Sequence, residues 1–391
     1  AVGNGSTNDL TAIQNALNAG GKIFFPNGTY KVNGTLTLIA DTEIDLGGST
    51  ISFEPTANDA LFNITSGTIT TEQNNFFLST INEGDHVGTV NGMYVGDLAN
   101  NYHKGDKIRV YSTENWTTKQ TRTAYTGEFN YIESTDASSA AFGFQFPIRR
   151  KLERVGEEIN IEVLSPTKNI TIRNGSCVSA TDHQNIFIEG DLVEDVHIDT
   201  VNITNFLRRT ATFSNSSDID FLKCNIKNNV PLVNSDGYQN DDNDRQGIRI
   251  EDHCEDVTIK DCIFNEVREP IRAFTNNTNN GGGKGQCRNI RFINNSVYGM
   301  KKHHAANATA DTEWGGILLW WGCDNYEVSG NYIVGGESNA IYLVGGSGIV
   351  KDNRIEQIGD GSSTGDVKHV IRYTNNTDYS DYDVEISNNI I

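Results

Sequence analysis

Three carboxylates in the C-terminal half of the sequence are candidates for the acid and base of glycoside hydrolysis. Glu251 ends a short strand pattern beside Arg249, Asp244 lies in the acidic run just before it, and Glu313 lies in a later insertion. Cleavage of a glycosidic bond needs one carboxyl group that keeps its proton and one that is ionised. Glu251 is the first candidate, and Asp244 and Glu313 follow it. The alternative for each is a solvated loop carboxylate, which is common in so acidic a chain.

Arginine and aromatic residues recur within or just after the same kind of short strand. Guanidinium groups pair with carboxylates through two hydrogen bonds, and aromatic rings stack on the apolar faces of sugars. The pattern therefore predicts a surface that binds a polysaccharide, most favourably one that contains sugar acids. The competing interpretation is the charged outer face that any parallel sheet carries. The candidate substrate-binding residues are Arg249, Arg272, Trp320, Tyr342, Arg372 and His303.

His303 also supports a second chemistry. β-Elimination from a uronate needs a base for the C5 proton and a cation that neutralises the carboxylate. His303, which follows two lysines, and Arg272 have the side chains for these roles. A lyase would use the same surface, and the plain alternative for His303 is a solvated basic turn.

A metal or cofactor is not expected. The run Asp241–Asp244 offers oxygen ligands for calcium, but it lacks the loop glycine and distal glutamate of an EF-hand, so calcium is a secondary hypothesis. The six cysteines form no tight CxxC pair, which favours buried reduced thiols over zinc or disulfides. The sequence contains no Walker loop or zinc-protease motif.

The elements that must position these residues form a repeat of short apolar strands. Each copy has two apolar residues separated by one other residue, and a small or polar residue, often Asn, follows three or four positions later. Such a repeat predicts a right-handed parallel β-helix. Apolar side chains stack inward from coil to coil, and an Asn adopts the left-handed bend while its amide bonds the next copy. The copies begin at Ile170, Val196, Ile219, Val257, Ile290, Tyr326, Gly348 and Val384.

A second strand series runs in parallel with the first, with one strand per coil. Because side chains alternate across a strand, the residues between the inward apolar ones point outward. Coils stack about 4.8 Å apart, so an oligosaccharide fits along the resulting columns. One column contains Arg249, Arg272, Tyr342 and Arg372, and the next contains Glu251 and Trp320.

The rest of the chain fits one domain over residues 1–391. A short amphipathic helix over residues 9–18, capped by Thr7 or Asn8, is predicted to cover the N-terminal end of the rod. Residues 70–165 alternate as antiparallel strands do, which predicts an inserted β module. The net charge of −20 argues against a nucleic acid or an anionic membrane as partner, and no stretch is apolar enough for membrane insertion.

The N-terminal region resembles the pectate-lyase-superfamily segment that opens many phage tailspikes. The matching residues are 3–9, 12–16, 20–26 and 28–30, and the module over residues 70–165 is similar to one found in many phage tail β-helices. The resemblance implies an all-β fold, a right-handed single-stranded parallel β-helix of the pectin-lyase-like type. It also implies a homotrimer on the virion that cleaves a bacterial capsular or O-antigen polysaccharide as an endo-glycosidase.

Two alternatives to hydrolysis stay open, because lyases, epimerases and inert coat proteins share the opening motif. One is a polysaccharide lyase, which includes a secreted bacterial protein acting as a monomer. The other is a non-catalytic β-helix that binds glycans without cutting them. Asn389–Ile391 end in the middle of a coil without a polar cap, which predicts a further segment or another subunit at this end.

Overall fold

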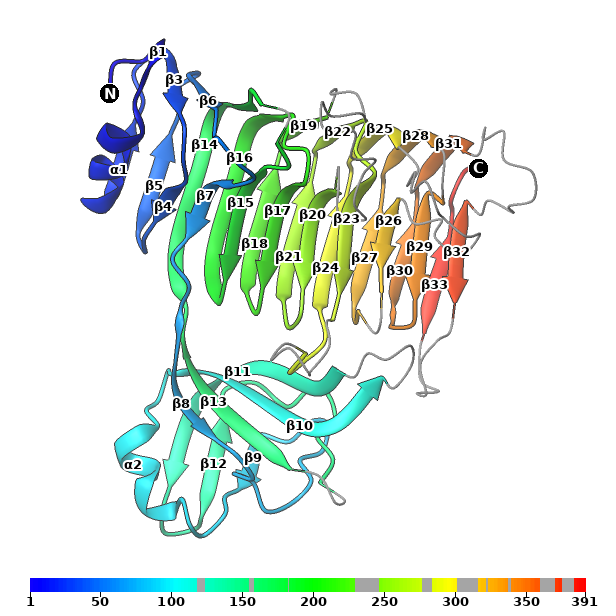
Figure 1. Cartoon of the computed structure of the whole chain (residues 1–391). Coiled ribbons are helices and arrows are strands. Elements are labelled where there is room, and N and C mark those ends of the chain that lie inside the picture. Colours follow the sequence, from blue (N-terminus) through cyan, green and yellow to red (C-terminus); the bar gives the residue numbers. More distant parts are fainter. Residues whose placement is uncertain are drawn as a thin grey trace.

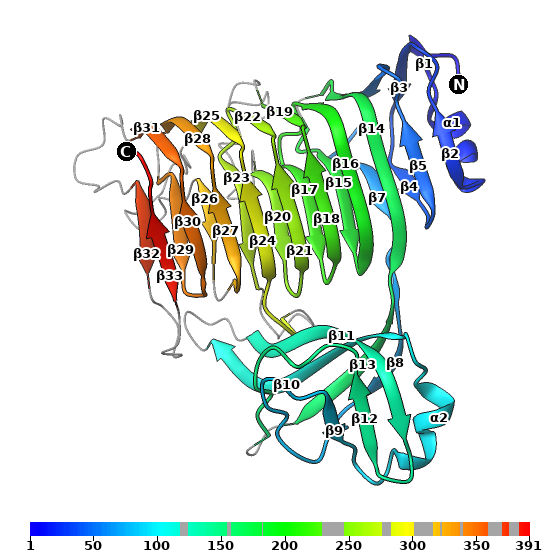
Figure 2. The same cartoon turned by 180° about the vertical axis from the view of Figure 1, so that it is seen from behind.

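The structure, a computed structural model, describes most of the chain as a rod of stacked coils with a smaller unit projecting from it (Figures 1 and 2). The described residues are 1–117, 124–154, 158–181, 183–228, 246–275, 283–300, 316–320, 323–336, 339–358, 370–374 and 383–391. No helix within these ranges has the length and apolar character needed to cross a membrane.

Two parallel sheets run along the rod. Sheet A is made of β1 (Asn4–Asn8), β2 (Gly21–Phe24), β3 (Thr29–Val32), β5 (Thr42–Asp45), β6 (Thr50–Phe53), β14 (Thr167–Ser179), β16 (Val193–Thr204), β18 (Ser217–Leu222), β19 (Asn225–Lys227), β21 (Glu255–Lys260), β22 (Ile263–Asn265), β24 (Arg288–Ile293), β25 (Ser296–Met300), β27 (Tyr326–Ser329), β28 (Tyr332–Gly336), β30 (Gly348–Lys351), β31 (Arg354–Ile358) and β33 (Val384–Ser387). Sheet B is made of β4 (Leu36–Leu38), β7 (Ala60–Ile64), β15 (Ile186–Asp191), β17 (Arg209–Ser214), β20 (Gln246–Glu251), β23 (Glu269–Phe274), β26 (Ile317–Leu319), β29 (Ile341–Val344) and β32 (Ile371–Thr374).

Equivalent residues of successive coils face one another across each parallel pair. Ile170 of β14 faces Val196 of β16, which faces Ile219 of β18, and Val257 of β21 and Ile290 of β24 continue the ladder. All of them are buried, and they belong to one hydrophobic core that extends along the rod. The predicted right-handed parallel β-helix is therefore confirmed.

The six cysteines are buried and form no disulfide, as predicted. Most of the thiols donate to backbone carbonyls, those of Cys224, Cys254, Cys262, Cys287 and Cys323. Cys287 Sγ, for example, lies 3.0 Å from the Asp252 carbonyl oxygen. Burial raises the pKa of Cys177 above its usual range, so this thiol is unreactive.

Buried asparagines form a second ladder at a bend of the coils. The amide nitrogens of Asn295, Asn331 and Asn353 each donate to the Oδ1 atom of the Asn one coil further on, at 3.2, 2.9 and 2.9 Å. The predicted amide bonding between copies is confirmed. The predicted left-handed backbone is wrong for these residues, because the residue before each Asn carries it: Asn294, Gly330, Asp352 and Asn388 have φ of 55°, 65°, 56° and 54°. The chain thus turns one residue earlier and lets the amide point into the core.

Replacing a ladder asparagine is expected to destabilise the rod. Asn331→Ala removes the donor to the Phe292 carbonyl (2.8 Å) and the acceptor of the Asn295 N–H (2.8 Å). Both groups are then buried without their partner, so the free energy of unfolding should fall by about 2–4 kcal/mol. Chemical denaturation measures the change. The matched control is Asn202→Ala, an exposed asparagine that lies one position further along the repeat, and an equal loss there would contradict the role of burial.

The N-terminal end of the rod carries the predicted short helix, α1 (Leu10–Asn18), with Ile13 and Leu17 buried against the first coils. Its N-cap residue is Asp9 rather than Thr7 or Asn8, and the Asp9 carboxylate accepts from the backbone N–H groups of Val2 and Gly3.

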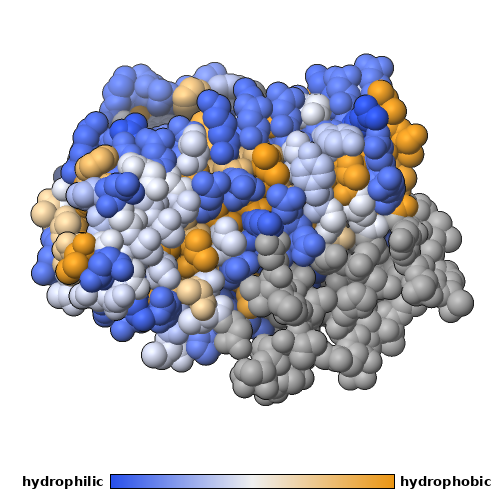
Figure 3. All heavy atoms as spheres, turned by 90° about the horizontal axis from the view of Figure 1, so that it is seen from above, coloured by the Kyte–Doolittle hydropathy of each residue, from blue (hydrophilic) through white to orange (hydrophobic). Residues whose placement is uncertain are grey.

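A surface view from above shows mixed polar and apolar residues, with hydrophobic residues gathered at the end opposite the N-terminus (Figure 3).

The projecting unit is an antiparallel sheet inserted between β7 and β14. In spatial order it contains β8 (Thr68–Gln73), β13 (Ile159–Ser165), β10 (Lys107–Thr117), β11 (Ala124–Asp136), β12 (Ala141–Phe144) and β9 (Val87–Thr89). The 3-10 helix η1 (Val95–Asp97) and α2 (Leu98–Asn101) precede β10. The module has its own core around Phe76, Phe77, Phe142 and Phe144. This antiparallel insertion, predicted from the sequence, is confirmed.

Buried polar contacts fix the module against the rod. Glu255, at the start of β21, contacts two module residues: its Oε1 accepts from the Phe129 backbone N–H at 3.1 Å, and its Oε2 pairs with Arg149 at 2.7 Å. His253 Nε2 donates to Glu255 Oε1 (3.0 Å), and its ring stacks on the Phe129 ring with centroids 3.9 Å apart. The buried Arg288 of β24 lies 3.6 Å from Glu128 of the module. Together these contacts hold the module in one orientation.

Candidate functional site

Within the described residues, the side chains predicted to bind substrate lie on the outer face of sheet B, in the expected register. Arg249 of β20 faces Arg272 of β23, and Tyr342 of β29 faces Arg372 of β32. Guanidinium groups and rings are stacked: Arg272 lies 5.1 Å from the Trp320 ring centroid and Arg372 lies 4.6 Å from that of Tyr342. We call this surface the arginine–aromatic face.

The centre of the arginine–aromatic face is buried, although its residues point away from the rod's core, whereas Arg372 at one end of the face is exposed. Arg272 is 5% exposed and Trp320 is 3% exposed, and Phe274, Leu318, Trp320 and Val344 form a separate apolar cluster. Glu251 forms an ion pair with Arg249 and lies 3.8 Å from Arg209. Burial and the like charge of Arg249 together lower the pKa of Arg209 to about 9.

The other predicted site residues lie outside the described part of the chain. These are Asp244, Glu313, His303 and the run 241–244 that was considered for calcium. Within the described residues, no group of three or more His, Cys, Asp or Glu side chains is placed to hold a metal ion.

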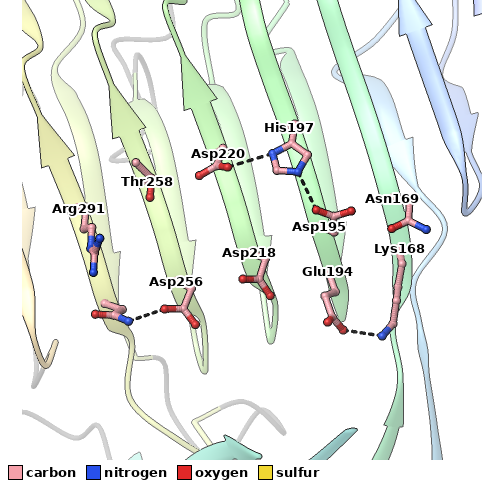
Figure 4. Close-up of a pocket in the computed structure, with 11 residues that line it drawn as sticks. Lys168, Asn169, Glu194, Asp195, His197, Asp218, Asp220, Asp256, Thr258 and Arg291 are labelled. Carbon is pink, nitrogen blue, oxygen red and sulfur yellow. Dashed lines mark hydrogen bonds and ion pairs between the residues drawn. The ribbon is translucent and has the colours of Figure 1, made fainter. Parts of the chain in front are cut away.

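A polar groove of about 620 Å³ lies on the outer face of sheet A, where β14, β16, β18, β21 and β24 follow one another. Figure 4 shows carboxylates and other polar side chains from successive strands arranged along it. It is lined by Lys168, Asn169, Glu194, Asp195, His197, Asp218, Asp220, Asp256, Thr258, Asn289 and Arg291. We call it the sheet A groove.

Three aspartates stack in consecutive coils of the groove. Asp195, Asp218 and Asp256 occupy equivalent positions, because the residues on both sides of each are paired in register. All three have left-handed backbones, with φ of 60°, 55° and 56°. Adjacent parallel strands lie about 4.8 Å apart, so neighbouring carboxylates in this column repel one another.

Backbone geometry alone does not require these aspartates. The same left-handed position holds Asn169 one coil before them, and Asn289 and Asn325 in the coils after them. Asparagine accepts this conformation without charge repulsion and also bonds between coils, as Asn325 does to Asn289 at 2.6 Å. Single aspartates also occupy this position elsewhere, at Asp41 for example, but three in consecutive coils carry a repulsion that asparagine would avoid, of the kind that marks functional sites.

The carboxyl groups of the groove differ in their tendency to ionise. Burial raises the pKa of Asp218, and the neighbouring Asp256 adds to the rise while Lys107 opposes it. Burial also opposes ionisation of Glu194, but Lys107 and Lys168, at 3.2 and 3.0 Å from its Oε2, outweigh that effect and lower its pKa. The groove thus places a carboxyl group with a raised pKa beside one with a lowered pKa.

His197 links two more carboxylates of the groove. Its Nε2 lies 2.7 Å from Asp195 Oδ1 and its Nδ1 lies 3.0 Å from Asp220 Oδ2 (Figure 4). The hydrogen bond with Asp220, supported by Asp195, raises the pKa of His197 to about 9. At neutral pH the imidazole is therefore a cation that holds Asp195 and Asp220 in place.

The groove residues were not among the predicted site residues, although the sequence contains a signal for them. His197 and Asp220 are the middle residues of two copies of the first strand repeat, and Asp195, Asp218 and Asp256 directly precede three copies. Asp before a strand is the ordinary residue of a bend. Only the register shows that three of them stack in adjacent coils.

Comparisons with known proteins show the fold. No protein-family model matches the chain, and no curated protein matches it either. Among solved structures, ORF18 of Geobacillus virus E2 matches with a TM-score of 0.50 and 12% identity, over 99% of this chain and 60% of its own.

Two tailspike structures also match. The Gp54 tailspike of Acinetobacter baumannii bacteriophage AP22, solved in complex with A. baumannii capsular saccharide, has a TM-score of 0.43 and 12% identity, over 98% of this chain and 67% of its own. The tailspike gp49 from Pseudomonas phage LKA1 has a TM-score of 0.44 and 12% identity, over 97% and 70%. At these identities, similarity of structure concerns the β-helix fold alone.

Proposed function

We propose that the protein is a tailspike-type depolymerase that binds a bacterial capsular or O-antigen polysaccharide and hydrolyses its glycosidic bonds in the sheet A groove. The observation that carries the proposal is the column of Asp195, Asp218 and Asp256, in which burial raises the pKa of Asp218. A homotrimer on the phage tail that acts outside the bacterial cell belongs to the same proposal, through the resemblance of the N-terminal region and the inserted module.

Asp218 is the proposed general acid and Asp256 the proposed nucleophile. Their strands are adjacent. The spacing of neighbouring strands, about 4.8 Å, is close to the roughly 5–5.5 Å between the two carboxyl groups of retaining glycosidases. Asn289 donates to Asp256 Oδ1 and orients that carboxylate.

In the first step, Asp218 gives its proton to the glycosidic oxygen while Asp256 bonds to the anomeric carbon and the leaving sugar departs with the proton. In the second step, Asp218 removes a proton from water, whose oxygen displaces Asp256 from the anomeric carbon. The product keeps the anomeric configuration of the substrate. Asp218 is again protonated and Asp256 is again a free carboxylate.

Hydrolysis suits the groove better than elimination. A lyase needs a cation directed at the carboxylate of a uronate. In the groove, Lys168 is paired with Glu194, and His197 is paired with Asp195 and Asp220. Arg291 lies on β24, beyond the proposed catalytic pair. The concentration of carboxylates also disfavours an anionic sugar at the cleavage point.

Glu251 offers an alternative location for the same reaction. Its pairing with Arg249 and its proximity to Arg209, together with its burial, favour a structural role on the arginine–aromatic face. Asp244, Glu313 and the sugar-binding role of Arg249, Arg272, Trp320, Tyr342, Arg372 and His303 stay predictions that mutagenesis can test one residue at a time.

Incubation of the protein with a panel of capsular and O-antigen polysaccharides tests the proposed reaction. Hydrolysis produces new reducing ends and no unsaturated sugar. An unsaturated product would support the lyase instead, and binding without cleavage would support a non-catalytic glycan-binding β-helix. Light scattering of the same sample distinguishes a trimer from a monomer.

A further inference from the structure

One lysine of the inserted module reaches the sheet A groove. Lys107 begins β10, far in the sequence from β16 and β18 of the rod, and it is 7% exposed. Its Nζ lies 3.2 Å from Glu194 Oε2 and donates to Ser217 Oγ at 2.5 Å. The rings of Phe129 and Tyr131 on β11 lie 4.9 and 5.8 Å from the same ammonium group. Lys107 is therefore enclosed between the module and the rod.

A chain of hydrogen bonds continues from Lys107 to the proposed acid. Ser217 Oγ accepts from Lys107 and donates its own proton to Asp218 Oδ2 at 3.2 Å. Tyr131 donates from its hydroxyl group to Glu194 Oε1 at 3.0 Å, so a second module residue contacts the carboxylate beside Asp218.

We infer that Lys107 is a positioning residue of the groove, through which the inserted module fixes the orientation of Asp218 and sets its affinity for the proton. The role assigned to Asp218 rests on the proposed function, whereas the contact between the module and Asp218 does not depend on it. The module is then a component of the reaction site as well as an appendage of the rod.

The charges around Asp218 give the direction of the effect. Glu194 on β16 and Asp256 on β21 favour its protonated form, and Lys107 on β10 is the cation that opposes them. Removing the ammonium group leaves the two carboxylates unopposed and also takes one of two lysines from Glu194. Asp218 should therefore keep its proton to a higher pH when an uncharged residue replaces Lys107.

Lys107→Met removes the charge and keeps the length of the side chain. In the full protein with labelled Asp carboxyl carbons, the titration midpoint of Asp218, assigned by its loss in Asp218→Asn, should rise by about 1 pH unit. The basic limb of the pH profile of hydrolysis should shift to higher pH by the same amount. Lys107→Arg should restore both values, because it keeps the charge.

Lys104→Met is the matched control, since Lys104 is exposed on the same module and pairs with Glu133. It removes the same charge and should change neither value. If Lys107→Met does not fold, Ser217→Ala interrupts the hydrogen-bond chain and should also raise the Asp218 midpoint. An Asp218 midpoint that is unchanged in the folded variants, or that moves equally with Lys104→Met, would overturn the inference. A shifted midpoint in a protein that cleaves no polysaccharide would uphold the inference and count against the proposed function alone.

Discussion

Asp218→Asn should lower kcat for polysaccharide hydrolysis by about 10²–10⁴-fold, the contribution that a positioned acid makes to such a reaction. The amide keeps the shape of the side chain and tolerates the left-handed backbone, so the rod should fold with unchanged stability. Because only the proton is lost, KM should change little. Reducing-end assays at several substrate concentrations separate the two constants.

Asp261→Asn provides the control for this variant. Asp261 is exposed and has a left-handed backbone with φ of 55°, but it lies outside the groove. Its replacement should leave kcat unchanged. Full activity in Asp218→Asn would contradict the proposed role of Asp218. Loss of activity in Glu251→Gln alone would indicate that the reaction takes place on the arginine–aromatic face.

Glu255→Ala should lower the free energy of unfolding by about 3–5 kcal/mol, because it removes the countercharge of the buried Arg288 and the acceptor of the Phe129 N–H and of His253. Glu255 contacts Arg149 and His253 and is 2% exposed. Denaturant titration measures the loss. Glu133→Ala, at an exposed pair with Lys104 on the module, should cost about 1 kcal/mol or less. Equal effects of the two substitutions would show that the buried contacts do not hold the module.

The same contacts make the docked module sensitive to acid. Burial opposes the charge on Glu255, but His253, Arg288 and Arg149 outweigh it and hold its pKa at about 2. Burial lowers the pKa of His253 to about 4. Both values lie below those of the unfolded chain. The stabilisation is therefore complete above about pH 6.5. It is lost as the pH falls, first as His253 takes up a proton and then, toward pH 2, as Glu255 does.

The rod could be predicted because its core repeats. Ile170, Val196 and Ile219 each begin an apolar pair, and a chain of such pairs buries its apolar side chains only by stacking coil upon coil. The outward register of Arg249 and Arg272 followed from the alternation of side chains along a strand. Alternation shows which way a side chain points and not what packs on it, so the burial of Trp320 was not predictable.

The sheet A groove was missed for a related physical reason. Asp218 and Asp256 are separated by 38 positions in the sequence, and each one alone is an ordinary bend residue. Their proximity depends on the lengths of the connections between coils, which periodicity does not determine. Lys107 is more remote still, because its contact with Ser217 depends on how the module docks.

The most direct measurement is a crystal structure of the Asp218→Asn variant with an oligosaccharide from a polysaccharide that the native protein degrades. The glycan should lie in the sheet A groove, with its scissile oxygen at residue 218 and the anomeric carbon facing Asp256. A glycan bound productively on the arginine–aromatic face, with the groove empty, would contradict the account.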